Sequence, residues 1–154
     1  MPQTVRFCAD VHLGKLARFL RMLGFDTVYK NDFSKEELYA ISANENRTLL
    51  SKSTYFKKFT DIVFYKIKSA DPQQQLKEVI AHFNLLNSLD PFIRCLYCNQ
   101  ILEKKDKEEV EQSLMPQTKK DFSEFWKCPG CKKVYWKGSH YERMMKQIEK
   151  LHII

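Results

Sequence analysis

The chain has 154 residues, which is long enough for one good hydrophobic core and a small appended unit. Hydrophobic residues make up 44% and aromatic residues 13% of the sequence, a composition that excludes disorder of the whole chain, and no apolar run approaches the roughly 20 residues that cross a bilayer. The net charge of +7 is spread over both parts of the chain and favours polyanionic partners. No leader sequence precedes the first unit, so we expect a soluble cytoplasmic protein that is not secreted.

Residues 5–27 form the most informative stretch. A short apolar run ends at Asp10, and apolar residues then recur with a period near 3.6, at Leu16, Phe19, Leu20 and Leu23. This pattern predicts a strand, a turn and an amphipathic helix that ends at Gly24. Ligands bind at the carboxyl ends of strands in open α/β sheets, and Asp also caps helix N-termini, so the pattern leaves a site role and a capping role open for Asp10.

Further strands and helices are predicted up to about residue 90. Residues 27–29, 47–51 and 61–67 are typical of strands. Ser34 and Glu37 form a capping box for a helix that ends at residues 44–46, and Asp71 with Pro72 begins another helix. The alternation predicts an α/β fold with a mostly parallel sheet between helices, over residues 1–90.

Residues 91–154 are predicted to form a second, smaller domain after a joint at 87–91. Its charged segment, 103–120, suits a solvated helix or loop. Residues 134–136 resemble a strand, and residues 141–151 carry the apolar stripe of a closing helix. We therefore expect a small cysteine-containing unit that ends in a helix.

Four of the five cysteines form two pairs with the same spacing, Cys95 with Cys98 and Cys128 with Cys131. Paired thiolates in this pattern are typical of tetrahedral zinc, and four sulfur ligands leave no open position for water, so the expected Zn²⁺ is structural. The pairs are separated by residues 99–127, more than the usual 15 to 20 or so, which implies an inserted excursion. His140 is a less favoured substitute ligand, and Cys8 is expected to be a small buried hydrophobe.

Several motifs resemble the Mut-seven-C (Mut7-C) family: F-x-A-D-x-x-L-G-K-L-A-R-F-L-R-M-L-G-F-D-T at 7–27, R-x-L-L-S at 47–51, R-C-L-Y-C-N at 94–99 and C-P-G-C-K-K-V-Y-W-K-G-S-H at 128–140. This domain occurs alone in prokaryotes and at the C-terminus of mutator-type 3′–5′ exoribonucleases. The resemblance implies a PIN-like nuclease fold followed by a zinc ribbon.

The resemblance also implies three acids at the site, because PIN-like nucleases hold divalent cations with several carboxylates. Asp10 fits the first position, whereas Lys35 and Ser53 stand where the second and third acids are expected, with Glu36 and Glu37 close to the second. Asp26, Asp32 and Asp61 are the nearby acids that would have to rebuild the site. A pocket depleted in this way suits phosphate binding without cleavage.

Candidate RNA-contacting cations surround this region, and one lies beside the second cysteine pair: Lys15, Arg18, Arg21, Arg47, Lys52, Lys57, Lys58 and Lys137. Backbone phosphates are bound by such cations without regard to sequence. Next to Lys137, the aromatic residues Trp136 and Tyr141 suit either stacking on unpaired bases or packing of the ribbon onto its neighbour.

These features lead to one preferred function and two alternatives. We expect binding of RNA, single-stranded in particular, by an accessory module of a larger 3′–5′ exoribonuclease in small-RNA silencing, located in the cytoplasm or in RNA granules. The first alternative is an active ribonuclease that uses Mg²⁺ or Mn²⁺ at Asp10. The second is a module that docks a protein partner.

Overall fold

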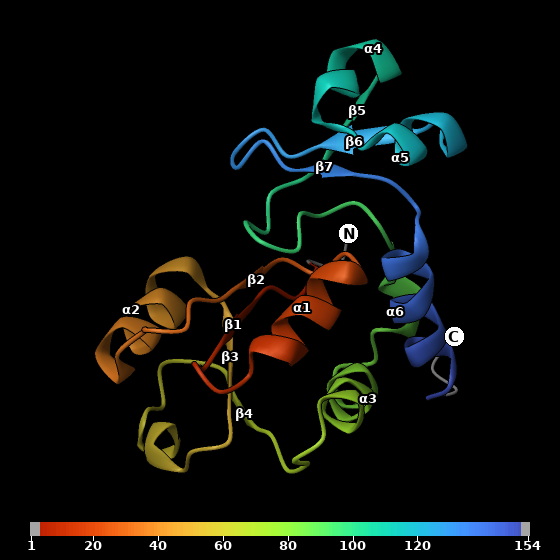
Figure 1. Ribbon diagram of the computed structural model, residues 1–154. Coiled ribbons are helices and arrows are strands. Elements are labelled where there is room, and N and C mark those ends of the chain that lie inside the picture. Colours follow the sequence, from red (N-terminus) through yellow and green to blue (C-terminus); the bar gives the residue numbers. More distant parts are fainter. Residues whose placement is uncertain (1–3, 152–154) are drawn as a thin grey trace.

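The computed structural model describes residues 4–151 and consists of an α/β unit and a small antiparallel sheet (Figure 1). Within these residues, no helix has the length and apolar character needed to cross a membrane. The elements of the α/β unit are β1 (Phe7–Ala9), α1 (Gly14–Met22), β2 (Thr27–Val28), α2 (Lys35–Glu45), β3 (Thr48–Ser51), the 3-10 helix η1 (Tyr55–Lys58), β4 (Phe64–Lys66), α3 (Pro72–His82) and η2 (Leu86–Ser88). The remaining elements are β5 (Glu103–Lys105), α4 (Lys107–Val110), η3 (Glu111–Ser113), α5 (Pro116–Asp121), β6 (Phe125–Lys127), β7 (Val134–Tyr135) and α6 (Ser139–Glu149).

The larger sheet has the order β2-β1-β3-β4 and all of its neighbouring strands are parallel, as the alternating pattern predicts. Its fourth strand is shorter than the predicted 61–67, because pairing with β3 extends only from Leu49 to Ser51. The carboxyl ends of β1 and β3 lie side by side, with Ala9 opposite Leu50. The residues that follow these two strands therefore share one edge of the sheet.

Alternate residues of the central strands bury into two separate cores, one on each face of the sheet. Phe7, Ala9 and Leu50 pack with α1 and α3 on one face, whereas Cys8 and Leu49 pack with α2 and η1 on the other. Figure 1 shows α2 on the opposite side of the strands from α1. Because successive side chains of a strand point to opposite faces, these fully buried strands contribute apolar side chains to the cores on both faces of the sheet.

The helix boundaries follow local signals in the sequence. Ser34 and Glu37 form the predicted capping box at the start of α2, with the Ser34 side chain accepting from Glu37 N at 3.0 Å. Asp71 caps α3 by accepting from Gln74 N at 3.0 Å. After α1, Gly24 has a φ of +95°, and a Cβ there would lie 2.4 Å from the carbonyl oxygen of Asp90. Glycine is therefore required at this position, where the chain leaves α1 and passes close to the backbone of Asp90.

The smaller sheet has the order β5-β6-β7 and is antiparallel. The segment 103–120, predicted as a solvated helix or loop, begins as the strand β5 because it pairs with β6, and the rest forms the short elements α4, η3 and α5. We call residues 92–138, which contain this sheet and both cysteine pairs, the ribbon.

The C-terminal helix α6 packs on the α/β unit. Met144, Ile148 and Leu151 belong to the same buried cluster as the residues of α1 and α3. In Figure 1, α6 descends from the ribbon beside α3. The ribbon is thus held between two segments, residues 85–91 and α6, that are both anchored in the larger core.

Cys8 is fully buried in the sheet, as expected, and burial raises the pKa of its thiol to about 12. The thiolate is the reactive form of cysteine, so we expect native Cys8 to resist iodoacetamide at pH 8 while becoming fully alkylated in denaturant. Peptide mass spectrometry distinguishes the two states. Rapid alkylation of Cys8 in the folded protein would contradict this placement.

Candidate functional sites

The four paired cysteines converge at one point of the ribbon. Their sulfur atoms all lie within 4.8 Å of one another, and Cys95 Sγ is 3.7 Å from Cys131 Sγ. A tetrahedral zinc ion with bonds of about 2.3 Å places its sulfur ligands about 3.8 Å apart. Cys95 and Cys128 are buried, whereas Cys131 is exposed. The geometry and the all-sulfur donor set therefore fit a metal site of the zinc type.

The ionisation of these thiols is consistent with a cation site. Although burial disfavours the thiolate, hydrogen bonds from the Tyr135 hydroxyl and from the backbone N–H of Cys98 lower the pKa of Cys95 to about 7. Burial and the neighbouring sulfur atoms raise the pKa of Cys98. Crowded thiolates repel one another, so a divalent cation is needed for all four to ionise together.

Tyr135 is a supporting residue of this centre that the sequence patterns did not single out. Its hydroxyl lies 3.1 Å from Cys95 Sγ and accepts a hydrogen bond from Leu96 N at 3.2 Å. The candidate ligand group comprises the four cysteines and does not include His140, as expected from the less favoured standing of that residue. The sequence signals for Tyr135 were its place in the strand-like run after the second cysteine pair and in the family motif at 128–140, neither of which gave it a role.

Asp10 lies at the carboxyl edge of the larger sheet, beside the end of β3. Its carboxylate accepts hydrogen bonds from Val11 N at 2.7 Å and from the Ser51 hydroxyl at 2.6 Å. The N-cap residue of α1 is Leu13, and no side chain caps this helix. The capping role for Asp10 is therefore wrong, and its carboxylate instead links the ends of β1 and β3.

The two positions where the family resemblance places further acids carry no carboxylate. Lys35 is exposed at the start of α2, with its Nζ 4.4 Å from the centre of the Tyr55 ring. The Ser53 backbone N–H donates to Ser51 Oγ at 3.0 Å, and the Ser53 hydroxyl accepts from Tyr55 N at 3.1 Å. Hydroxyl groups thus occupy the end of β3 next to Asp10.

The other acids named from the sequence lie away from Asp10 or in solvent. Asp26 directly precedes β2 and therefore lies at the amino edge of the sheet, opposite Asp10, and Asp61 bonds to the Tyr39 hydroxyl on α2. Asp32 is exposed in the loop before α2. Among residues 4–151, the cysteine cluster is the one group of three or more His, Cys, Asp or Glu side chains close enough to share a metal ion.

Two of the eight candidate RNA-contacting cations are buried and bonded within the fold. Arg21 donates to the carbonyl oxygens of Thr27 at 2.9 Å and Leu96 at 2.8 Å. Arg47 pairs with Asp26 at 2.8 Å and with Glu45 at 2.9 Å. Their exposed fractions are 5% and 7%, so neither guanidinium is presented to a ligand in solution.

The other six candidate cations are exposed, and the structure brings them together only in part. Lys15 and Arg18 line a cavity of about 310 Å³ between α1, the start of α3 and α6, which we call the cationic cavity. Lys52, Lys57 and Lys58 follow β3, with Lys58 Nζ 4.0 Å from the centre of the Tyr55 ring.

Lys137 lies apart from the other cations, on the ribbon. Its ammonium group is 5.6 Å from the ring centres of Phe92 and Trp126 and 5.9 Å from that of Tyr141. Of the two rings predicted beside Lys137, Tyr141 lies there, and the other two rings near the ammonium group are Phe92 and Trp126 in place of Trp136. Phe92 contacts both rings edge-on, at 4.6 Å from Trp126 and 5.0 Å from Tyr141.

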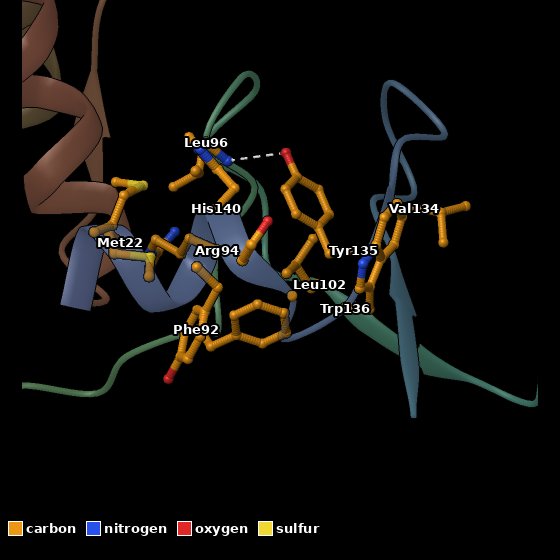
Figure 2. Close-up of a pocket in the computed structure, with 13 residues that line it drawn as sticks. Met22, Phe92, Arg94, Leu96, Leu102, Val134, Tyr135, Trp136 and His140 are labelled. Carbon is orange, nitrogen blue, oxygen red and sulfur yellow. Dashed lines mark hydrogen bonds between the residues drawn. The ribbon is translucent and has the colours of Figure 1, made fainter. Parts of the chain in front are cut away.

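A second cavity, of about 230 Å³, lies between the ribbon and the α/β unit (Figure 2). Four aromatic residues line it, Phe92, Tyr135, Trp136 and Tyr141, and we call it the aromatic cavity. Arg94 also lines it, with its guanidinium donating to Gly24 O at 3.0 Å and Asn99 O at 2.9 Å.

Comparison with known proteins gives one family. The model of the Mut7-C RNAse domain matches residues 5–148, which include the parallel sheet, the four cysteines and most of α6. No curated protein and no solved structure matches the chain. Because the match covers nearly the entire chain, and because the parallel sheet followed by a four-cysteine unit is the fold that the resemblance implies, the chain belongs to the Mut7-C RNase domain family.

Proposed function

We propose that this Mut7-C domain binds single-stranded RNA and does not cleave it, and that it serves as an accessory module of a larger 3′–5′ exoribonuclease in small-RNA silencing. The observation that carries the proposal is the chemistry of the sheet edge, where Asp10 is accompanied by the hydroxyl groups of Ser51 and Ser53. With Asp10 as its one acid, this edge lacks the further carboxylates that would bind the metal ions needed for RNA cleavage. Its surface can still bind RNA.

Metal-ion energetics support the lack of cleavage. A Mg²⁺ or Mn²⁺ pair in a nuclease needs several carboxylate oxygens, and a single carboxylate leaves each ion bound almost entirely by water. Lys52 follows Ser51 immediately, and a unit charge about 4 Å from a cation repels it by about 1 kcal/mol in water and several times more near a protein surface. Asp10 is the residual candidate catalytic residue of this edge.

Exposed cations around the same edge support phosphate binding. Lys15 and Arg18 extend from the first two turns of α1, which begins just after Asp10, and Lys52 follows β3. Phosphate contacts of this kind release counterions and give affinity that falls with salt. The candidate set for RNA contact therefore comprises Lys15, Arg18, Lys52, Lys57 and Lys58 on the α/β unit, and Lys137 apart from them on the ribbon.

The metal that the cysteines hold is proposed to be structural Zn²⁺. Four sulfur donors at tetrahedral spacing fill the coordination sphere, so no position remains for water or substrate. The ion fixes the ribbon, and the ribbon in turn supplies Phe92, Arg94 and Tyr135 to the aromatic cavity. Zinc thus acts on RNA binding only through the fold.

Charge reversal on α1 tests the proposed RNA binding. The double variant Lys15→Glu with Arg18→Glu should weaken binding of single-stranded RNA by at least about tenfold and should lower the slope of log affinity against log salt by about 0.7 for each phosphate that is no longer neutralised. Fluorescence anisotropy of a labelled oligoribonucleotide over a salt series measures both quantities. The control, Lys107→Glu with Lys120→Glu on α4 and α5, has the same net charge and should bind like the wild type.

The opposite results separate the alternatives. An equal decrease in affinity in the two double variants would show that affinity depends on net charge alone and not on this edge. Absent or salt-independent RNA binding would favour the protein-docking alternative, in which the charge is incidental.

A further inference from the structure

The aromatic cavity and the cationic cavity adjoin each other at the start of α6. His140 and Met144 line both cavities, so these two side chains form the wall that the cavities share. Ser139 and His140 are exposed, which places the rim of the aromatic cavity at the protein surface. A ligand that reaches both spaces must be extended and must have two chemically different parts.

The aromatic cavity is suited to a flat ring. Phe92 at the start of the ribbon, Tyr135 in β7, Trp136 just after β7 and Tyr141 in the first turn of α6 supply ring surface (Figure 2). A Cβ at Gly138 would lie 2.7 Å from Nε1 of Trp136, so glycine at this position lets the indole lie against the chain at the cavity wall. Unpaired bases stack on aromatic side chains of this kind with little dependence on sequence.

Two polar groups of the aromatic cavity, those of Arg94 and Tyr135, are held by hydrogen bonds within the fold. Two hydrogen bonds to backbone carbonyl groups hold the guanidinium of Arg94 in one orientation, and the Tyr135 hydroxyl is engaged by Cys95 and Leu96. A planar guanidinium can stack on a base or donate to its edge, and a preordered one does so with little entropic cost.

Size restricts the ligand of the aromatic cavity to a single ring system. Its volume of about 230 Å³ is below the roughly 300–1,000 Å³ of pockets that take drug-sized molecules. The neighbouring cationic cavity is larger, at about 310 Å³, and presents Lys15 and Arg18 against the single carboxylate of Asp71. The pair therefore fits one base together with the charged backbone beside it.

We infer that the aromatic cavity receives one unpaired base of an RNA strand whose adjoining phosphates lie against Lys15 and Arg18 in the cationic cavity. This inference rests on the proposed RNA binding and adds a defined subsite to it. His140 lies between the base and the phosphates and positions the strand where it passes from one cavity to the other. One nucleotide of the bound strand thus contributes more to the binding affinity than its neighbours do.

Abasic substitution along a single-stranded oligoribonucleotide tests the subsite, with the full, metal-loaded chain as the protein. Each oligonucleotide lacks the base of one nucleotide, and its affinity is compared with that of the intact strand. One position should lose about tenfold in affinity, within the range expected for a stacked base, and the other positions much less. In Tyr141→Leu and in His140→Ala, this positional loss should disappear. His140 is exposed, so its variant keeps the test independent of any folding defect in Tyr141→Leu.

Two matched variants should keep the positional loss. Tyr97→Ala removes an exposed aromatic ring of the ribbon that does not line the cavity, and Lys107→Glu reverses a charge on α4 at a residue that lines neither cavity. RNA binding with no sensitive position, or with a positional loss unchanged in both cavity variants, would overturn the subsite while leaving the proposed function intact. Absence of all RNA binding would overturn both.

Discussion

Removing the metal from the four cysteines is expected to unfold the ribbon while the parallel sheet remains folded. The buried cluster beside the cysteines consists of Cys95, Leu102 and Cys128, two of which are candidate metal ligands, and the other buried hydrophobic residues of the ribbon are Val110 and Phe125. Zinc binding to small four-ligand units contributes about 10–16 kcal/mol of folding free energy. So small a core cannot replace that contribution, whereas the sheet and α6 have a large core of their own.

Hydrogen exchange followed by mass spectrometry measures this outcome. After chelation, backbone protection should be lost in β5 and β6 and retained in β1 and β3. The variant Cys128→Ser should reproduce the loss, and Cys8→Ala, which removes a cysteine outside the cluster, should keep one metal ion per chain. Full protection of β6 in protein shown to be free of metal would contradict a structural role for the ion.

Replacing Asp26 with Asn is expected to lower the free energy of unfolding by about 3 kcal/mol, the lower end of the range for breaking a buried ion pair. Asp26 accepts from Arg47 at 2.8 Å and from Asn99 at 2.6 Å, and so joins the amino edge of the sheet to the first cysteine pair. The variant leaves Arg47, which is only 7% exposed, without its main countercharge. Urea denaturation of the metal-loaded protein measures the difference.

The ion pair also predicts a pH dependence of stability. Although burial disfavours the carboxylate, hydrogen bonds from Arg47 and Asn99 hold the pKa of Asp26 below its usual value of about 3.9. A lowered pKa in the folded state stabilises the protein above the pKa of the unfolded state, and this stabilisation is lost as pH falls through the folded pKa. Asp26→Asn should lack this acid-dependent portion. Glu45→Gln, which removes the more exposed partner of Arg47, should cost less than about 1 kcal/mol, and an equal cost for both variants would contradict the assignment.

Local signals in the sequence predicted most of the α/β unit. The capping box of Ser34 and Glu37, the Asp71 cap and the stop at Gly24 are each confirmed, because these features depend on contacts within a few residues. The two cysteine pairs lie 30 residues or more apart, so their convergence depends on a distant contact, and it was predictable only because four sulfur ligands with this spacing are typical of one tetrahedral metal site. Strand β4 was overestimated because its length depends on its partner and not on its own composition.

Features that depend on distant contacts could not be predicted from the sequence. The helical period placed Arg21 on a polar face, yet its guanidinium is buried and donates a hydrogen bond to the carbonyl oxygen of Leu96, 75 residues away. Arg47 is likewise held by Asp26, from another part of the sheet. The aromatic cavity combines Phe92 with Tyr141, and only the packing of α6 on the larger core brings these residues together.

The most direct test of the central claim is an assay of RNA cleavage and RNA binding in the same sample. The purified, zinc-loaded chain is incubated with labelled single-stranded RNA and Mn²⁺, and both the bound fraction and the strand length are followed. The sheet edge at Asp10, Ser51 and Ser53 predicts bound RNA of unchanged length, in the wild type and in Asp10→Asn alike. Mn²⁺-dependent shortening that disappears in Asp10→Asn would contradict the claim and establish an active ribonuclease.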